Sequence, residues 1–65
     1  MKVFEVTIYA KDGGVVVSEE TPGIEDLHYI NRDGFACANW YCPSKGKRLS
    51  QFVPNHLVTG VFTVA

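Results

Sequence analysis

The sequence predicts a mainly β fold, in which residues 1–65 form one small domain of five short antiparallel strands. Apolar and polar residues alternate in the opening segment, as they do in a half-buried strand. Later segments are rich in β-branched and aromatic residues, and Gly, Pro, Asn and Asp separate them at short intervals. Because one small sheet cannot cover its own apolar face, we expect a barrel or a strongly twisted meander.

The first two strands are expected at residues 3–10 and 15–20. The alternation in the first segment places one apolar set on a single face, namely Phe4, Val6, Ile8 and Ala10. Asp12 and Gly13 then predict a two-residue type I′ turn, which requires positive φ at both central positions. Three consecutive valines favour the returning strand.

The middle of the chain allows two interpretations. Thr21 could cap a short helix over residues 24–30, or residues 27–30 could form a strand. We favour the strand, followed by a type I turn at residues 31–34 that closes on a left-handed glycine. Residues 35–42 would be its partner strand. Whether residues 22–29 include a helical turn stays open.

The last part of the chain predicts a polar loop at 43–47, a strand at 48–53 and a closing strand at 57–65. Proline cannot donate to a sheet, so Pro54 should interrupt the pairing and begin a short 3₁₀ turn. This segment, Phe52-Val53-Pro54-Asn55-His56-Leu57-Val58, resembles the ending of SH3-like barrels. The resemblance implies a five-stranded SH3-like barrel, but it carries over no proline-peptide groove, because the aromatic opening strand and acidic loop are absent.

Composition and charge favour a folded protein that meets a partner. The chain is 46% hydrophobic and 20% charged, which excludes intrinsic disorder. Residues 1–33 hold all seven carboxylates against three cations, and residues 34–65 hold three cations and no carboxylate. Such asymmetry steers encounters with partners. The small format also resembles short orphan proteins of phages and mobile elements, which implies an accessory or regulatory factor acting on a host protein.

The cysteines and the absence of long apolar runs predict a cytoplasmic protein. Cys37 and Cys42 would lie roughly 16 Å apart on an extended strand, beyond the reach of a disulfide. Two free thiols indicate a reducing compartment. We see neither a signal peptide nor a membrane-spanning run, and expect no membrane partner.

The predicted binding residues surround the basic loop at 44–48. They combine two aromatic rings with three cations, namely Trp40, Tyr41, Lys45, Lys47 and Arg48. Trp, Tyr and Arg dominate protein interfaces, which favours docking of another protein. The same residues suit nucleic acid, because cations contact phosphates while rings stack on bases. A solvated loop, with Trp40 filling the core, is the plainer interpretation. Which of the two rings is exposed stays open.

No catalytic, metal or cofactor site is expected. Cys37 and Cys42 are spaced too widely for a zinc pair, and both histidines stand alone. A domain of this size seldom encloses a ligand pocket, so we expect a non-enzyme. An acidic band would orient a partner or simply be solvated, and it contains Glu19, Glu20, Glu25 and Asp26.

The sequence therefore predicts a small non-catalytic protein-binding module. The alternative is a nucleic-acid-binding small β-barrel that uses the basic loop and its neighbouring aromatics. A homodimer through the edge strand at 57–65 is a third expectation. The identity of the partner, the biological process and the oligomeric state stay open.

Overall fold

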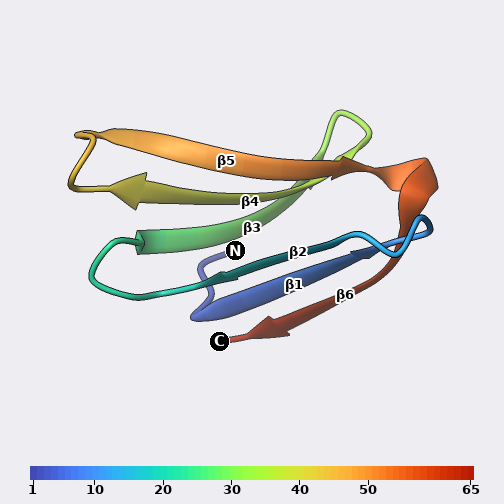
Figure 1. The fold of residues 1–65 in the computed structure, drawn as a ribbon, viewed down its shortest axis with the longest axis horizontal. Helices are drawn as coiled ribbons and strands as arrows, with labels where there is room; N and C mark the ends of the chain where they lie inside the picture. The colour runs from blue at the N-terminus through green and yellow to red at the C-terminus, as the bar shows by residue number, and fades with distance from the viewer.

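The computed structural model describes the backbone of residues 1–65 and every side chain except those of Val16 and Val17. Across that part of the chain it contains six strands and one 3₁₀ turn (Figure 1). In chain order these are β1 (Glu5–Ala10), β2 (Val15–Glu19), β3 (Glu25–Arg32), β4 (Phe35–Cys42), β5 (Lys47–Pro54), η1 (Asn55–Leu57) and β6 (Val58–Val64). The mainly β prediction is confirmed.

The strands form two antiparallel three-stranded sheets, ordered β2-β1-β6 and β3-β4-β5. Within the described residues the sheets do not join into a closed barrel, so the predicted five-stranded barrel is not what we observe. The count of five is wrong by one. The segments expected as strands, with the favoured one at 27–30, already number six, and that segment is the full eight-residue strand β3. No helical turn occupies residues 22–29, where a tight turn between Thr21 and Ile24 leads directly into β3.

The core lies between the two sheets and is built from small and medium side chains. Its fully covered members are Val6 and Ile8 of β1, Leu27 of β3, and Ala36 and Ala38 of β4, with Val3 and Val53 nearly so. The two alanines let the sheets approach closely at the centre. A core with so few large side chains gives a small domain only a modest free energy of unfolding.

The chain bends at Phe4, and this bend links the two sheets. Before the bend, Val3 N–H donates to the carbonyl of Leu27 at 3.0 Å, and Lys2 forms a bridge with His28. After the bend, β1 begins at Glu5 and joins the other sheet. We expected Phe4 on the buried face of a continuous strand, and this is wrong. The alternation is broken where the backbone passes between sheets, and Phe4 is exposed.

The first Asp-Gly turn is not type I′, contrary to our prediction. Of its two central residues only Gly13 has positive φ, at 83°. Gly13 N–H donates to the carbonyl of Ala10 at 3.0 Å, and Asp12 Oδ1 accepts from Gly14 N–H at 2.8 Å. This pattern is a type I turn that ends in a left-handed glycine bulge.

The second Asp-Gly turn has the geometry expected of the first. Arg32 and Phe35 pair directly across it, which leaves a two-residue loop. Asp33 and Gly34 have φ of 56° and 84°, as a type I′ turn requires. Both turns contain Asp-Gly, so the register of the flanking strands selects the turn type, and the dipeptide alone does not.

Gly34→Ala is expected to lower the free energy of unfolding by about 1–2 kcal/mol, because an alanine Cβ is disfavoured in the left-handed region. No atom lies within 4 Å of the position of that Cβ, so the loss would come from the backbone conformation alone. Gly23→Ala is the matched control, since that site is equally open and lacks positive φ. Equal urea midpoints for the two variants would contradict the turn assignment.

The predicted 3₁₀ turn before the last strand is confirmed at η1. Asn55 fixes it to the turn between β3 and β4, because its N–H donates to the carbonyl of Gly34 at 2.8 Å. The amides of Asn55 and Asn31 also exchange two hydrogen bonds, at 2.9 and 3.1 Å.

Among the residues that the structure describes, we find no helix with the length and hydrophobicity that a bilayer crossing requires.

Candidate functional site

The sheet β3-β4-β5 has one face toward the core and one face that no other element covers. Ala36 and Ala38 of β4 face the core, so alternate residues of the same strand face outward. The cross-strand register then defines the exposed side, which we call the outer face. It consists of His28, Ile30 and Arg32 of β3, Phe35, Cys37, Asn39 and Tyr41 of β4, and Arg48, Ser50 and Phe52 of β5.

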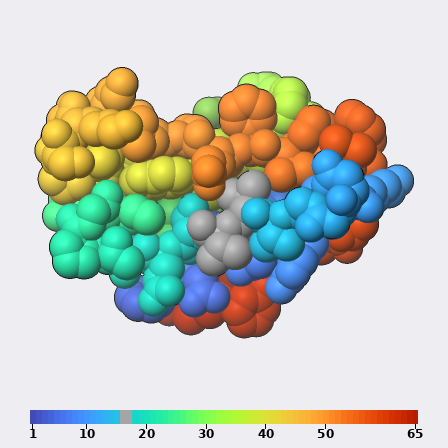
Figure 2. Space-filling view, viewed as in Figure 1, coloured from blue at the N-terminus to red at the C-terminus, as the bar shows by residue number. Residues whose placement is uncertain are grey.

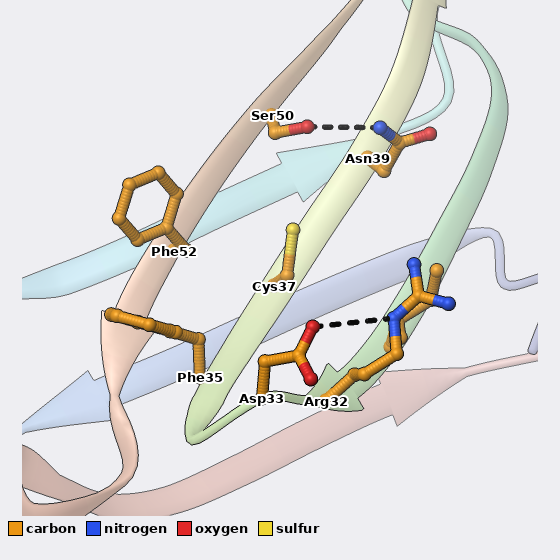
Figure 3. A pocket seen from close by; sticks show the side chains of 8 residues that line it. Arg32, Asp33, Phe35, Cys37, Asn39, Ser50 and Phe52 are labelled. Atoms are coloured by element: carbon orange, nitrogen blue, oxygen red, sulfur yellow. Dashed lines mark hydrogen bonds and ion pairs between the residues drawn. The ribbon is translucent and has the colours of Figure 1, made fainter.

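The apolar half of the outer face is centred on two phenylalanines (Figure 3). The rings of Phe35 and Phe52 meet edge to face, with centroids 5.3 Å apart and an interplanar angle of 82°. Phe35 is 38% exposed and Phe52 is 61% exposed. Exposed apolar side chains that form a contiguous patch are candidates for an interaction surface.

The phenylalanines border a hollow of about 500 Å³ that is open to solvent. The hollow is also lined by Ile30 and Cys37 and by four polar residues, namely Arg32, Asp33, Asn39 and Ser50. A volume of this order suits a small ligand or a bulky side chain. We expected no enclosed ligand pocket in so small a domain, and this open hollow does not test that expectation. An uncovered twisted sheet face can form a shallow basin without enclosing a cavity.

The polar half of the outer face is organised around Asp26. This residue lies at a bulge in β3 with a φ of 52°, so its side chain leaves the regular alternation of the strand. Arg48 Nη1 donates to Asp26 Oδ2 at 3.0 Å, and Nη2 donates to the Asp26 carbonyl at 3.0 Å. His28 Nε2 and Lys2 Nζ lie 3.1 and 3.4 Å from Oδ1. The carboxylate therefore contacts side chains from three segments, namely Lys2, His28 and Arg48.

A second set of hydrogen bonds extends this network across β4 to β5. Arg48 Nε donates to Asn39 Oδ1 at 2.6 Å, and Asn39 Nδ2 donates to Ser50 Oγ at 2.9 Å. The polar row is thereby fixed beside the hollow that Asn39 and Ser50 also line. Fixed amide and hydroxyl groups can recognise a partner with little loss of side-chain entropy.

The Asp26 network lowers the pKa of that carboxyl below its ordinary value of 3.8, mainly through His28 and then Arg48. A lowered native pKa stabilises the fold above the unfolded-state value, and the contribution is lost as pH falls through the native value. Asp26→Asn should therefore reduce stability at neutral pH, by less than a core truncation. The difference should shrink as the pH falls below 3.8 and vanish once the pH is below the lowered native pKa. Urea titrations at several pH values measure this.

Asp33→Asn is the control for that experiment. Its carboxylate is exposed and lies 4.0 Å from Arg32, so this variant should unfold like the wild type at neutral pH. An Asp26→Asn variant with wild-type stability at every pH would show that the network adds nothing to folding.

The predicted binding residues fall on both sides of the sheet. Trp40 faces inward and packs, partly buried, against the core. This agrees with the interpretation in which Trp40 fills the core. Tyr41 faces outward, is exposed, and pairs across strands with Arg48. Lys45 and Lys47 are exposed at the loop between β4 and β5. The structure thus brings only Tyr41 and Arg48 together on the outer face. Lys47 pairs with Cys42 on the opposite face of the sheet, Lys45 lies in the turn, and Trp40 packs inward.

The acidic band lies at the same end of the molecule as the basic loop (Figure 1). Lys2 Nζ contacts Glu20 at 3.3 Å and also Asp26, which raises the pKa of Lys2, with Glu20 as the main cause. With the Asp26–Arg48 pair, these contacts partly neutralise the charge asymmetry that the sequence shows. The folded chain therefore shows a smaller separation of positive and negative charge than the sequence suggests.

Both cysteines are free thiols, as the sequence predicts, and they lie on opposite faces of β4. The Cys42 sulfur is buried and lies 3.3 Å from Ser44 Oγ. Hydrogen bonding by Ser44, and then by the Lys45 amide, lowers the pKa of the Cys42 thiol. In the described part of the chain no three His, Cys, Asp or Glu side chains gather where they could hold a metal ion.

Sequence reasoning missed Phe35 and Phe52 as site residues. The signal was present in the segment 35–42, where Ala36 and Ala38 alternate with Phe35 and Cys37. Two alanines at that spacing indicate the face that packs closely on another layer, so the larger residues between them must face outward.

Comparisons of this chain with protein-family models, with curated proteins and with solved structures find no significant match.

Proposed function

We propose that this protein is a small non-catalytic protein-binding module, and that the outer face is its docking surface. The exposed Phe35–Phe52 pair beside an open hollow is the observation that supports this proposal. Exposed aromatic anchors next to a pocket are typical of the residues that dominate binding energy. The phenylalanines add an apolar centre to the residues that the sequence predicts, of which Tyr41 and Arg48 share their face.

The partner that fits is an extended segment of another protein. One bulky apolar side chain would fill the hollow beside Phe52, and the segment would then cross the polar row of Asn39 and Ser50. Phe52 and Arg48 are four positions apart on β5, a span of roughly 13 Å. An acidic residue about four positions from the apolar anchor would therefore reach the Tyr41 hydroxyl, which lies beside Arg48 across the strands.

Nucleic acid is the second candidate, because Phe35, Phe52 and Tyr41 offer three exposed rings on one sheet face. Such rings can stack on successive bases. Phosphate binding also needs cations that are free to displace counterions. Arg48 is held by Asp26, and Arg32 lies beside Asp33, so the outer face itself carries little net positive charge. Protein binding is the better supported of the two.

We also propose an SH3-like fold relationship and a cytoplasmic location. An SH3-like relationship is supported by the β3-β4-β5 meander, by η1 before the last strand and by the antiparallel pairing of β6 with β1. The free thiols support a reducing compartment such as the cytoplasm. A phage-type accessory role on a host protein remains an analogy of size and format.

The test is a selection of displayed random peptides on the purified protein, followed by mapping of amide chemical-shift changes. We expect peptides with an apolar anchor and a nearby acidic residue, and shifts concentrated on Cys37, Asn39, Ser50 and Phe52. A parallel titration with single-stranded oligonucleotides should show no shifts at moderate salt. Oligonucleotide binding to the same amides, weakening steeply with salt, would favour the second candidate. Peptides that shift only amides of the other sheet would overturn the assignment of the face.

A further inference from the structure

The edge strand β6 differs in its chemistry from the other three edge strands, which are β2, β3 and β5. Natural sheets protect exposed edges with charges or proline. In the described chain β2, β3 and β5 each contain charged side chains, and β5 also ends in Pro54. Strand β6 (Val58–Val64) contains neither a charged side chain nor a proline.

Strand β6 is also poorly covered on both of its faces. It pairs with β1 on one side and, within the described residues, with no strand on the other. Figure 1 shows it at the border of the molecule, and Figure 2 shows its atoms along the same border. Val61 is 38% exposed on one face, and Phe62 and Val64 are 52% and 37% exposed on the other. An apolar edge of this length is a template for another strand.

We infer that β6 pairs antiparallel with β6 of a second copy of this chain, which extends β2-β1-β6 into a continuous six-stranded sheet. The strand has seven residues, so a symmetric antiparallel pairing centres on Val61. The face that carries Phe62 then gains a complementary neighbour. Phe62 lies opposite Gly60 of the second copy. Val58 does not share that face, because the bulge beside Ala10 turns it toward the core.

Gly60 explains why a second copy fits this edge. The Tyr9 ring lies 3.9 Å from the position that a Gly60 Cβ would occupy, so an aromatic side chain already shields one side of the glycine. Phe62 of the second copy would shield the other side, in the manner by which aromatic residues stabilise glycine within sheets. The strand is uncharged, so pairing with itself brings no like charges together. This surface lies on the opposite sheet from the outer face, and the inference does not depend on the proposed function.

Sedimentation over a concentration series from micromolar to millimolar tests the inference. We expect a reversible monomer–dimer equilibrium, with hydrogen exchange of β6 amides slowing as the dimer forms while β5 amides are unchanged. Val61→Lys should shift the protein to monomer, because the two-fold axis would place two lysines directly opposite each other. Val15→Lys is the matched control, since Val15 is an exposed valine on β2, the other edge of the same sheet. That variant should dimerise normally.

A charge-swap experiment separates lost pairing from lost folding. Val61→Glu alone should also be monomeric, and an equimolar mixture of Val61→Lys and Val61→Glu should restore a dimer. A wild-type protein that stays monomeric throughout the series would overturn the inference. So would a Val61→Lys variant that dimerises like the wild type, or a mixture of the two charged variants that stays monomeric although each is folded.

Discussion

Leu27→Ala is expected to leave much of the protein unfolded at room temperature. Truncating a fully buried leucine costs about 2–5 kcal/mol, and a domain of this size has only about 3–5 kcal/mol of stability in total. Leu27 has no exposed surface and is one of the largest fully buried side chains, with Ile8 and Val6. Its carbonyl also accepts the Val3 hydrogen bond that ties the opening segment to β3. Urea titration followed by circular dichroism measures the loss.

Leu49→Ala is the matched control for this prediction. Leu49 is only partly buried on β5 and does not belong to the core cluster, so its truncation should cost about 1 kcal/mol, a typical value for a point substitution. If Leu27→Ala were as stable as Leu49→Ala, the contact between the two sheets would not be the main source of stability.

Phe52→Ala is expected to weaken binding of a selected peptide about 30-fold or more. Truncating a central aromatic anchor commonly costs at least about 2 kcal/mol, and each 1.4 kcal/mol corresponds to a tenfold change. Phe52 is the more exposed ring of the edge-to-face pair and borders the hollow. Its removal therefore takes away one wall of the site and the partner of Phe35. Calorimetric titration of the peptide into each variant gives the affinities.

Phe4→Ala is the control for the binding experiment, because Phe4 is an exposed phenylalanine at the bend between the sheets and lies outside the outer face. It should bind the peptide with wild-type affinity. Thermal unfolding of both variants checks that each is folded, since Phe52 makes few buried contacts. A folded Phe52→Ala variant with unchanged affinity would remove the hollow from the proposed function.

Local signals predicted most of the secondary structure. The strand at 35–42 has the predicted bounds, and the 3₁₀ turn before the last strand is present. These features depend on short-range chemistry, namely the alternation of apolar and polar residues, segments of β-branched residues, and a proline that has no backbone N–H to donate. The turn types were interchanged because register, a long-range property, sets the loop length at Asp12-Gly13 and at Asp33-Gly34.

The candidate site was predicted only in part. Tyr41 and Arg48 lie at one end of the outer face, whereas Lys47 is on the opposite face of the sheet and Lys45 is in the turn. The Asp26 network was not foreseen, because it joins Lys2, His28 and Arg48 from segments far apart along the chain. The acidic band and basic loop were each interpreted alone, although pairing between them decides how much charge stays free.

The sequence by itself determined that this protein is a small β domain with tight turns, free thiols and opposite charge in its two halves. Those properties follow from residue type and from spacing over a few positions. Only the tertiary structure decided which alternate residues face water, that Phe35 and Phe52 meet above a hollow, and that Arg48 is held by Asp26. The physical reason is that each outcome depends on how the two sheets pair and pack, which joins residues far apart along the chain.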